Sequence, residues 1–173
     1  MLFRSGIAQG SYFDLDTAQS TFITAGPGQK DEIWMWRAPD YGGDRVAIAV
    51  VDGTALQVWH ERTSGWTLEN TIAAADLSPL PFIYSPEPFV WRGRSYVALQ
   101  LGTKKFDNAQ IWIVAIDPGL PLRLQASNSG VVASRGEPEW LVTASGAYVY
   151  YSQYNKLLRA SLRRGSEIGR AHV

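Results

Sequence analysis

Apolar residues recur along the chain in short runs that alternate with polar ones and are rich in β-branched and aromatic side chains, a pattern typical of strands. Turn signals, such as Asp52-Gly53 and Asp117-Pro118-Gly119, separate the runs. Helix-forming composition is limited to Glu69–Leu77 and the tail. The pattern predicts an antiparallel all-β chain with strands at VAIAVV (46–51), ALQVWHE (55–61), YVALQLG (96–102), QIWIVAID (110–117), AYVYYSQ (147–153) and KLLRASL (156–162).

A proline followed by an acidic residue occurs three times, at Pro39-Asp40, Pro86-Glu87 and Pro138-Glu139, with the prolines 47 and 52 residues apart. Each pair precedes an aromatic residue, a glycine turn and two strands. Repeats of roughly 40 to 50 residues with about four strands each have the size of propeller blades. A β-sandwich would also give short strands, but it would not explain the recurrence. We therefore expect a β-propeller fragment of about three blades, with residues 1–167 as one partial domain.

The innermost strand of each propeller blade faces the central channel, so the three acids are expected to converge there. Strand alternation further places Glu137 and Glu139 on one face. Crowded carboxylates at a channel mouth repel one another, so one of them should keep its proton to a higher pH. Glycoside hydrolysis needs such a protonated acid beside an ionised one. The candidate catalytic residues are therefore Asp40, Glu87, Glu137 and Glu139.

The segment EPEWLVTASGAYVYYS (137–152) resembles the general-acid region of the five-bladed β-propeller glycosidases, in particular glycoside hydrolase family 43 and its relatives. The resemblance spans Asp31–Tyr154. It implies a five-bladed parent, secreted or periplasmic, that hydrolyses glycosidic bonds, with Glu137 or Glu139 as the general acid. Asp40 and Glu87 match the family's remaining catalytic acids only by their position in the repeat. They are candidates for the base and for the acid that tunes the pKa of its partner.

Two other functions stay open. A non-catalytic propeller could bind a glycan or a protein on the same face, and a purely structural repeat would use each acid to hold neighbouring sheets together. For a single acid beside proline or glycine, accepting backbone N–H bonds is the more common role.

Four further residues are candidates for substrate binding. Trp36, Tyr84 and Trp91 could stack on sugar rings, although core packing is the alternative for each. Arg135 could bind a carboxylate or sugar hydroxyls, or instead pair with the neighbouring glutamates. His60 is expected on the surface of an outer strand, and Asp14 and Asp16 are expected in a turn that closes a preceding blade.

Composition excludes several classes of function. Sixteen basic residues balance sixteen acidic ones among 173, so no charge excess points to nucleic acid. The chain has no cysteine, no run of about 18 apolar residues that would suit a membrane span, no clustered zinc ligands and no phosphate-binding loop. We predict no cofactor and no metal, a carbohydrate as ligand, and a monomer for the full-length protein.

The last six residues, IGRAHV (168–173), correspond to read-through into a sequencing adapter, so we expect the natural chain to continue only to about Glu167. A natural basic tail is the alternative. His172 is given no role.

Overall fold

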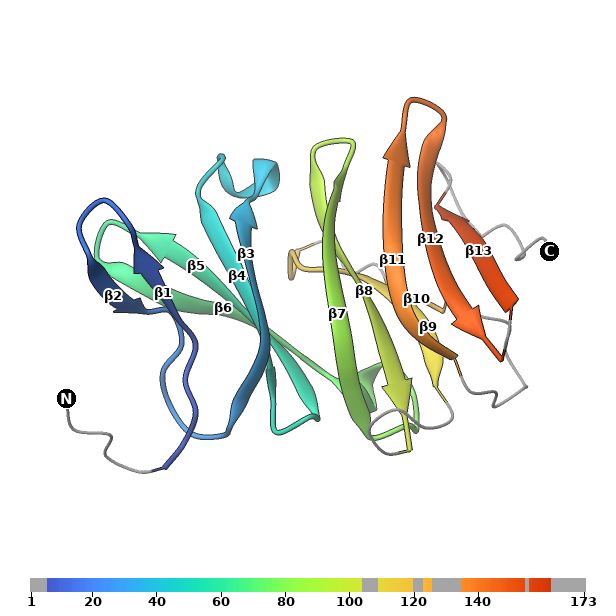
Figure 1. Ribbon diagram of the computed structural model, residues 1–173, viewed down its shortest axis with the longest axis horizontal. Coiled ribbons are helices and arrows are strands. Elements are labelled where there is room, and N and C mark those ends of the chain that lie inside the picture. Colours follow the sequence, from blue (N-terminus) through green and yellow to red (C-terminus); the bar gives the residue numbers. More distant parts are fainter. Residues whose placement is uncertain (1–5, 104–108, 120–122, 126–134, 155, 163–173) are drawn as a thin grey trace.

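The computed structural model describes residues 6–103, 109–119, 123–125, 135–154 and 156–162, with backbone only for 123–125, 135 and 162. These residues form antiparallel sheets, as Figure 1 shows, which confirms the all-β prediction. The strands are β1 (Ser11–Asp14), β2 (Gln19–Phe22), β3 (Lys30–Arg37), β4 (Arg45–Val51), β5 (Ala55–Arg62), β6 (Gly65–Ala73), β7 (Phe82–Trp91), β8 (Arg94–Gly102), β9 (Gln110–Ala115), β10 (Arg123–Gln125), β11 (Arg135–Thr143), β12 (Gly146–Gln153) and β13 (Lys156–Leu162).

The strands pair in the order in which they follow one another along the chain. β1 and β2 form a hairpin sheet, β3–β6 the first four-stranded sheet, β7–β10 the second four-stranded sheet, and β11–β13 a three-stranded sheet. Tight turns join neighbours: Asp52 and Gly53 have φ of 50° and 67°, and Arg92 and Gly93 have φ of 52° and 74°. Two consecutive left-handed residues are what a two-residue hairpin turn requires. The predicted glycine turns are therefore present.

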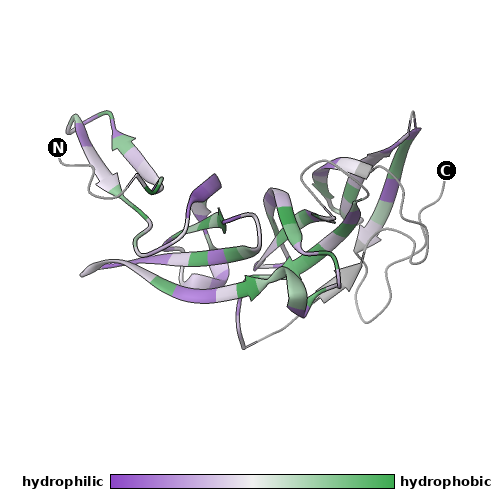
Figure 2. Cartoon of the chain, turned by 90° about the horizontal axis from the view of Figure 1, so that it is seen from below, coloured by the Kyte–Doolittle hydropathy of each residue, from purple (hydrophilic) through white to green (hydrophobic). Residues whose placement is uncertain are grey.

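The two larger of three apolar clusters in the described residues each form a layer between consecutive sheets. One layer joins the two four-stranded sheets, with Ile48 and Val58 on one side and Val97 and Leu99 on the other. The second layer joins the second four-stranded sheet to the three-stranded sheet. Figure 2 shows hydrophobic and hydrophilic residues along the strands. In β8 every residue from Ser95 to Gly102 is buried, so the second four-stranded sheet is covered on both faces.

The first strand of each larger sheet lies at its edge, and these edges lie next to one another. β7 contacts both β3 and β11, and the three strands run side by side in the centre of Figure 1. Consecutive meander sheets with adjacent first strands are the arrangement expected within a propeller. The number of blades in a closed ring stays a prediction.

The hairpin sheet packs on the outer side of the first four-stranded sheet. Ile23 lies against Ala47 and Trp59, and the Arg45 guanidinium lies over the Tyr12 ring at 4.9 Å. The Asp14 carboxylate accepts hydrogen bonds from the backbone N–H groups of the two residues that follow Leu15, both at 2.9 Å. The turn predicted at Asp14 and Asp16 is present.

The segment Glu69–Leu77, whose composition suggested a helix, is mostly strand. β6 runs to Ala73 along β5, and only a short 3₁₀ turn, η2 (Ala74–Asp76), follows it. Pairing with a neighbouring strand has outweighed the local propensity of an alanine-rich run.

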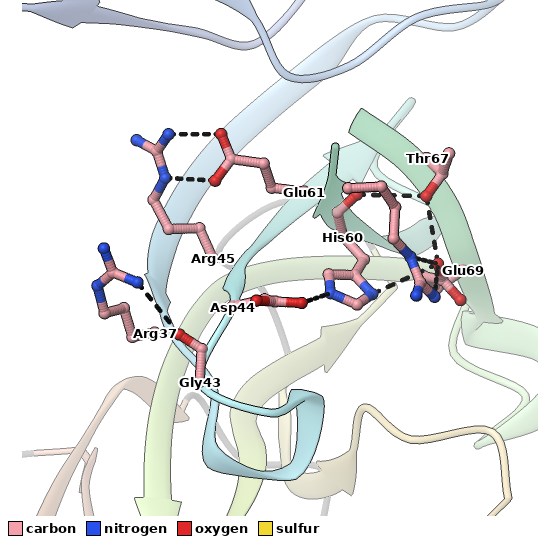
Figure 3. Close-up of polar contacts among 9 residues, drawn as sticks. Arg37, Gly43, Asp44, Arg45, His60, Glu61, Thr67 and Glu69 are labelled. Carbon is pink, nitrogen blue, oxygen red and sulfur yellow. Dashed lines mark hydrogen bonds and ion pairs between the residues drawn. The ribbon is translucent and has the colours of Figure 1, made fainter. Parts of the chain in front are cut away.

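His60 is not a surface residue, contrary to the sequence prediction. Its side chain is 4% exposed, and Nε2 lies 2.9 Å from an Asp44 carboxylate oxygen. Nδ1 lies 3.5 Å from a Glu69 carboxylate oxygen, and the same carboxylate accepts a hydrogen bond from Arg62. Figure 3 shows His60 between the two carboxylates, with the Arg45–Glu61 ion pair beside it. The contact with Asp44 gives the buried ring a polar partner, which lowers the cost of burying this histidine.

Asp40 lies in the 3₁₀ turn η1 (Pro39–Tyr41), which follows β3, and not at the start of a strand. Its carboxylate accepts hydrogen bonds from the Ser95 backbone N–H at 2.8 Å and from the Ser95 hydroxyl at 2.7 Å. Ser95 belongs to β8, so Asp40 connects the two four-stranded sheets. It therefore has the structural role that the sequence left open for each acid.

Replacing Asp40 with alanine should lower the free energy of unfolding by about 1–3 kcal/mol, because the backbone N–H of the buried Ser95 loses its acceptor. Urea unfolding measures this change. The matched control is Asp16→Ala in the exposed β1–β2 turn, for which a change within about 0.5 kcal/mol is expected. Equal stability of the two variants would contradict the role given to Asp40.

Candidate active site at three repeated bulges

The edge strands β3, β7 and β11 share the same irregularity. In each, one extra residue is inserted between two paired positions: Asp31 and Trp34 in β3, Tyr84 and Glu87 in β7, and Gly136 and Glu139 in β11. The first bulged residue is left-handed every time, with φ of 51° at Glu32, 47° at Ser85 and 53° at Glu137. Three identical β-bulges therefore mark equivalent places in three sheets.

The bulges correct the repeat that the sequence predicted. Glu32, Ser85 and Glu137 lie 53 and 52 residues apart, a more even spacing than that of the prolines. The residue equivalent to Pro86 and Pro138 is Ile33, and Pro39 lies beyond the end of β3. Proline suits the bulge because a bulged residue need not donate to the ladder.

The bulge also changes which residues share a face. Gly136 pairs with Ser152 and Glu139 pairs with Tyr150, so Gly136 and Glu139 lie on the same side of the three-stranded sheet. Glu137 is the bulged residue itself. The predicted shared face of Glu137 and Glu139 was therefore wrong, because it assumed an unbroken alternation along β11.

A left-handed conformation costs a non-glycine residue about 1–2 kcal/mol, and such strain is often found at functional sites. At the β7 bulge, one unpaired backbone group finds its hydrogen-bond partner in the first four-stranded sheet. Ser85 has no partner in the β7–β8 ladder, and its backbone N–H donates to the Glu32 carboxylate at 2.5 Å. Glu32 thus bridges the bulges of β3 and β7.

Two residues after each left-handed residue, the strands carry Trp34, Glu87 and Glu139 at equivalent positions. Burial, together with the charges of Glu139 and Glu32, raises the pKa of Glu87 from 4.5 to about 7. Glu87 therefore lies close enough to Glu32 and to Glu139 for each to oppose its ionisation, and we call these three residues the carboxylate cluster. Trp34 is 44% exposed at the neighbouring edge.

A pocket of about 250 Å³ lies beside the cluster, between the two four-stranded sheets. It shares Glu32 with the cluster, and its other charged lining residues, Asp31 and Asp52, are also acidic. Its lining is completed by Val50, Gly53, Phe82, Ile83 and Tyr84. The pocket and the cluster together form the candidate active site.

The structure brings together only part of the site that the sequence predicted. Glu87 and Glu139 interact, Glu137 is exposed in the β11 bulge, and Asp40 is bonded to Ser95. Glu32 takes the place that the sequence analysis gave to Asp40.

The predicted stacking residues are mostly enclosed. Trp91 is 8% exposed, and the Arg92 guanidinium lies over its ring at 4.7 Å, whereas Tyr84, 2% exposed, lines the pocket. Sugar stacking on either ring stays a prediction. Trp36 packs against the core and donates from Nε1 to the Ser95 hydroxyl at 3.3 Å. The side chain of Arg135 lies outside the described part of the chain, as does the tail 163–173 with the predicted artefact.

Sequence reasoning missed Glu32 and Trp34, although a signal for them exists. Aligning the chain on a 52-residue interval from Glu137 reaches Ser85 and then, 53 residues earlier, Glu32. The sequence analysis aligned Pro39 with Pro86 and Pro138. That alignment was wrong, because β3 has an isoleucine, Ile33, at the position where the other two strands have proline.

Within the described residues, no group of three or more histidines, aspartates or glutamates is arranged to hold a metal ion. The same residues contain no helix with the length and apolar character needed to cross a membrane. No protein-family model and no curated protein matches the chain.

The raised pKa of Glu87 predicts a specific dependence of stability on pH. Because the folded chain holds this proton more tightly than the unfolded chain, stability should fall as the pH rises from 4.5 to about 7. Glu87→Gln cannot ionise. Relative to wild type, its free energy of unfolding by urea should therefore be higher at about pH 8 than at about pH 5. A difference that does not change with pH would contradict the placement of Glu87.

Proposed function

We propose that the chain carries the acid site of a β-propeller-type glycoside hydrolase, with Glu87 as the general acid. The observation that carries this proposal is that Glu87, with its pKa raised to about 7, interacts with Glu139 and Glu32. Glycosidases need one carboxyl that is protonated near neutral pH and a second that is ionised. The resemblance had implied Glu137 or Glu139 as the acid, and burial favours Glu87 instead.

In this mechanism Glu87 donates its proton to the glycosidic oxygen as the bond from that oxygen to the anomeric carbon breaks. The ionised Glu139 either removes a proton from the attacking water or attacks the anomeric carbon itself, and the separation of the two carboxyl groups decides which. Glu32 is a positioning residue, because its negative charge keeps the proton on Glu87. The exposed ring of Trp34 offers a stacking surface for a sugar.

A second candidate function is glycan binding without hydrolysis. The exposure of Trp34 favours it, since stacking on an indole ring needs no pair of carboxylates. The two functions differ in what Glu87 does. If the site hydrolyses glycosides, replacing Glu87 strongly lowers turnover. If the site only binds glycans, wild type shows no turnover at all.

Glu87→Gln and Glu139→Gln should each lower kcat on aryl glycosides by about 10²–10⁴-fold, the range in which general acid–base groups contribute. A panel of aryl glycosides with the 173-residue chain measures this, with folding checked by circular dichroism. Asp16→Asn, which removes a carboxylate from the distant β1–β2 turn, is the control and should match wild type. Unchanged turnover in Glu87→Gln would overturn the proposed acid, and absence of turnover in wild type would favour binding alone.

A further inference from the structure

One face of the three-stranded sheet is open, although the equivalent face of each four-stranded sheet is covered by the next sheet. Trp36, Phe89 and Leu141 hold equivalent positions on β3, β7 and β11, each two residues beyond the first paired residue after the bulge. Trp36 packs against the apolar layer between the four-stranded sheets, and Phe89 is 2% exposed within the second layer. Leu141, in contrast, is 48% exposed. An apolar position that the repeat normally buries is therefore uncovered here.

Strand register shows which other side chains share this open face. Val149 and Tyr151 are buried against the second four-stranded sheet, so the even-numbered residues of β12 lie on the opposite face. Leu141 pairs with an even-numbered residue of β12, and so does Leu157, which is 71% exposed. Together these side chains form a diagonal apolar strip, which we call the third-sheet strip, of Leu141, Tyr148, Tyr150 and Leu157.

Two charged residues flank the third-sheet strip on opposite sides. Glu139 pairs with Tyr150 from β11, and Arg159 pairs with it from β13. Arg159 is exposed, and its guanidinium lies over the Tyr148 ring at 4.9 Å. The β13 side of the strip is therefore basic.

The hairpin sheet, at the other end of the molecule in Figure 1, also has an open apolar face. Tyr12 packs towards the first four-stranded sheet, so Phe13 and Phe22 lie on the face that points away from it. These two rings are 57% and 52% exposed, and Leu15 in the turn is 88% exposed. Terminal units of stacked repeats normally have a polar outer face, which keeps them apart. We call Phe13, Leu15 and Phe22 the hairpin strip.

Charge favours contact between these unlike ends over contact between like ends. The hairpin sheet, Ser11–Phe22, carries Asp14 and Asp16 and no basic residue. β13 carries Lys156 and Arg159 and no acidic residue. Opposite charges across an interface select the partner and its orientation, whereas two hairpin sheets would bring like charges together.

We propose that the third-sheet strip binds the hairpin strip of a second copy of this chain, so that copies associate head to tail. The hairpin sheet of the second copy takes the place that the next sheet takes on each four-stranded sheet. Because the contact joins unlike surfaces, it leaves one strip free on each copy and either closes a ring or extends a chain of copies. This association departs from the monomer expected from sequence, which did not reveal which apolar side chains stay exposed.

The test uses two variants of the 173-residue chain, each with one strip blocked: Leu157→Asp in the third-sheet strip and Phe22→Asp in the hairpin strip. Analytical ultracentrifugation measures the mass of each sample. Wild type should form dimers and larger species at about 100 μM, where contacts with micromolar Kd are populated. Each variant alone should associate about 30-fold or more weakly, because an apolar anchor of the contact is lost.

Mixing the two variants gives the sharpest result. Leu157→Asp keeps an intact hairpin strip, and Phe22→Asp keeps an intact third-sheet strip. An equimolar mixture should therefore recover wild-type affinity but stop at a one-to-one dimer, because the two blocked strips cannot extend it. Leu141→Asp and Phe13→Asp form a second pair and should behave in the same way.

The matched control is Leu68→Asp, which changes an exposed leucine, 46% exposed, on the first four-stranded sheet and should associate like wild type. Circular dichroism checks that every variant is folded. A wild type that stays monomeric would overturn the proposal, since the open faces would then not bind each other. Association of either blocked variant alone with wild-type affinity would show contact between like ends and would also overturn it, as would folded variants whose mixture does not dimerise.

Discussion

The candidate site depends on one backbone feature, the left-handed bulge that interrupts β3, β7 and β11 at equivalent positions. A regular strand would place successive side chains on opposite faces. One extra residue shifts this alternation locally and changes the direction of the side chains that follow. Because the three strands lie side by side, the shift brings Trp34, Glu87 and Glu139 to the same level of neighbouring sheets. The conformational cost of the bulges is repaid by the packing of two continuous apolar layers.

Acidic residues in this chain have two distinct roles, which their partners distinguish. Asp40 accepts two hydrogen bonds from one buried serine and joins neighbouring sheets. Glu87 lies in a partly buried position, where two other acids oppose its ionisation. Glu32 combines both roles, since it holds the Ser85 N–H and also raises the pKa of Glu87. The same carboxylate thus connects the stability of two sheets to the chemistry proposed at their edge.

Much of the fold could be predicted from sequence, because alternation and turn residues act locally. Strand β4 and the Asp52-Gly53 turn follow directly from their residues. The site was harder to predict, because a bulge depends on pairing with a neighbouring strand and has no fixed residue signature. In β3 the position of the repeated proline is occupied by Ile33, so the proline-based alignment did not identify Glu32 as a member of the repeat. His60 was misplaced for a related reason: its burial depends on Asp44 and Glu69, which lie on neighbouring segments.

An NMR titration of the Glu87 carboxyl carbon in wild type, Glu32→Gln and Glu139→Gln measures the contact between the three carboxylates most directly. We expect Glu87 to titrate with a pKa of about 7 in wild type and lower in each variant, because each substitution removes a neighbouring negative charge. A Glu87 pKa near 4.5 that neither substitution changes would show that the three carboxylates do not lie close together, and the proposed acid site would then be wrong.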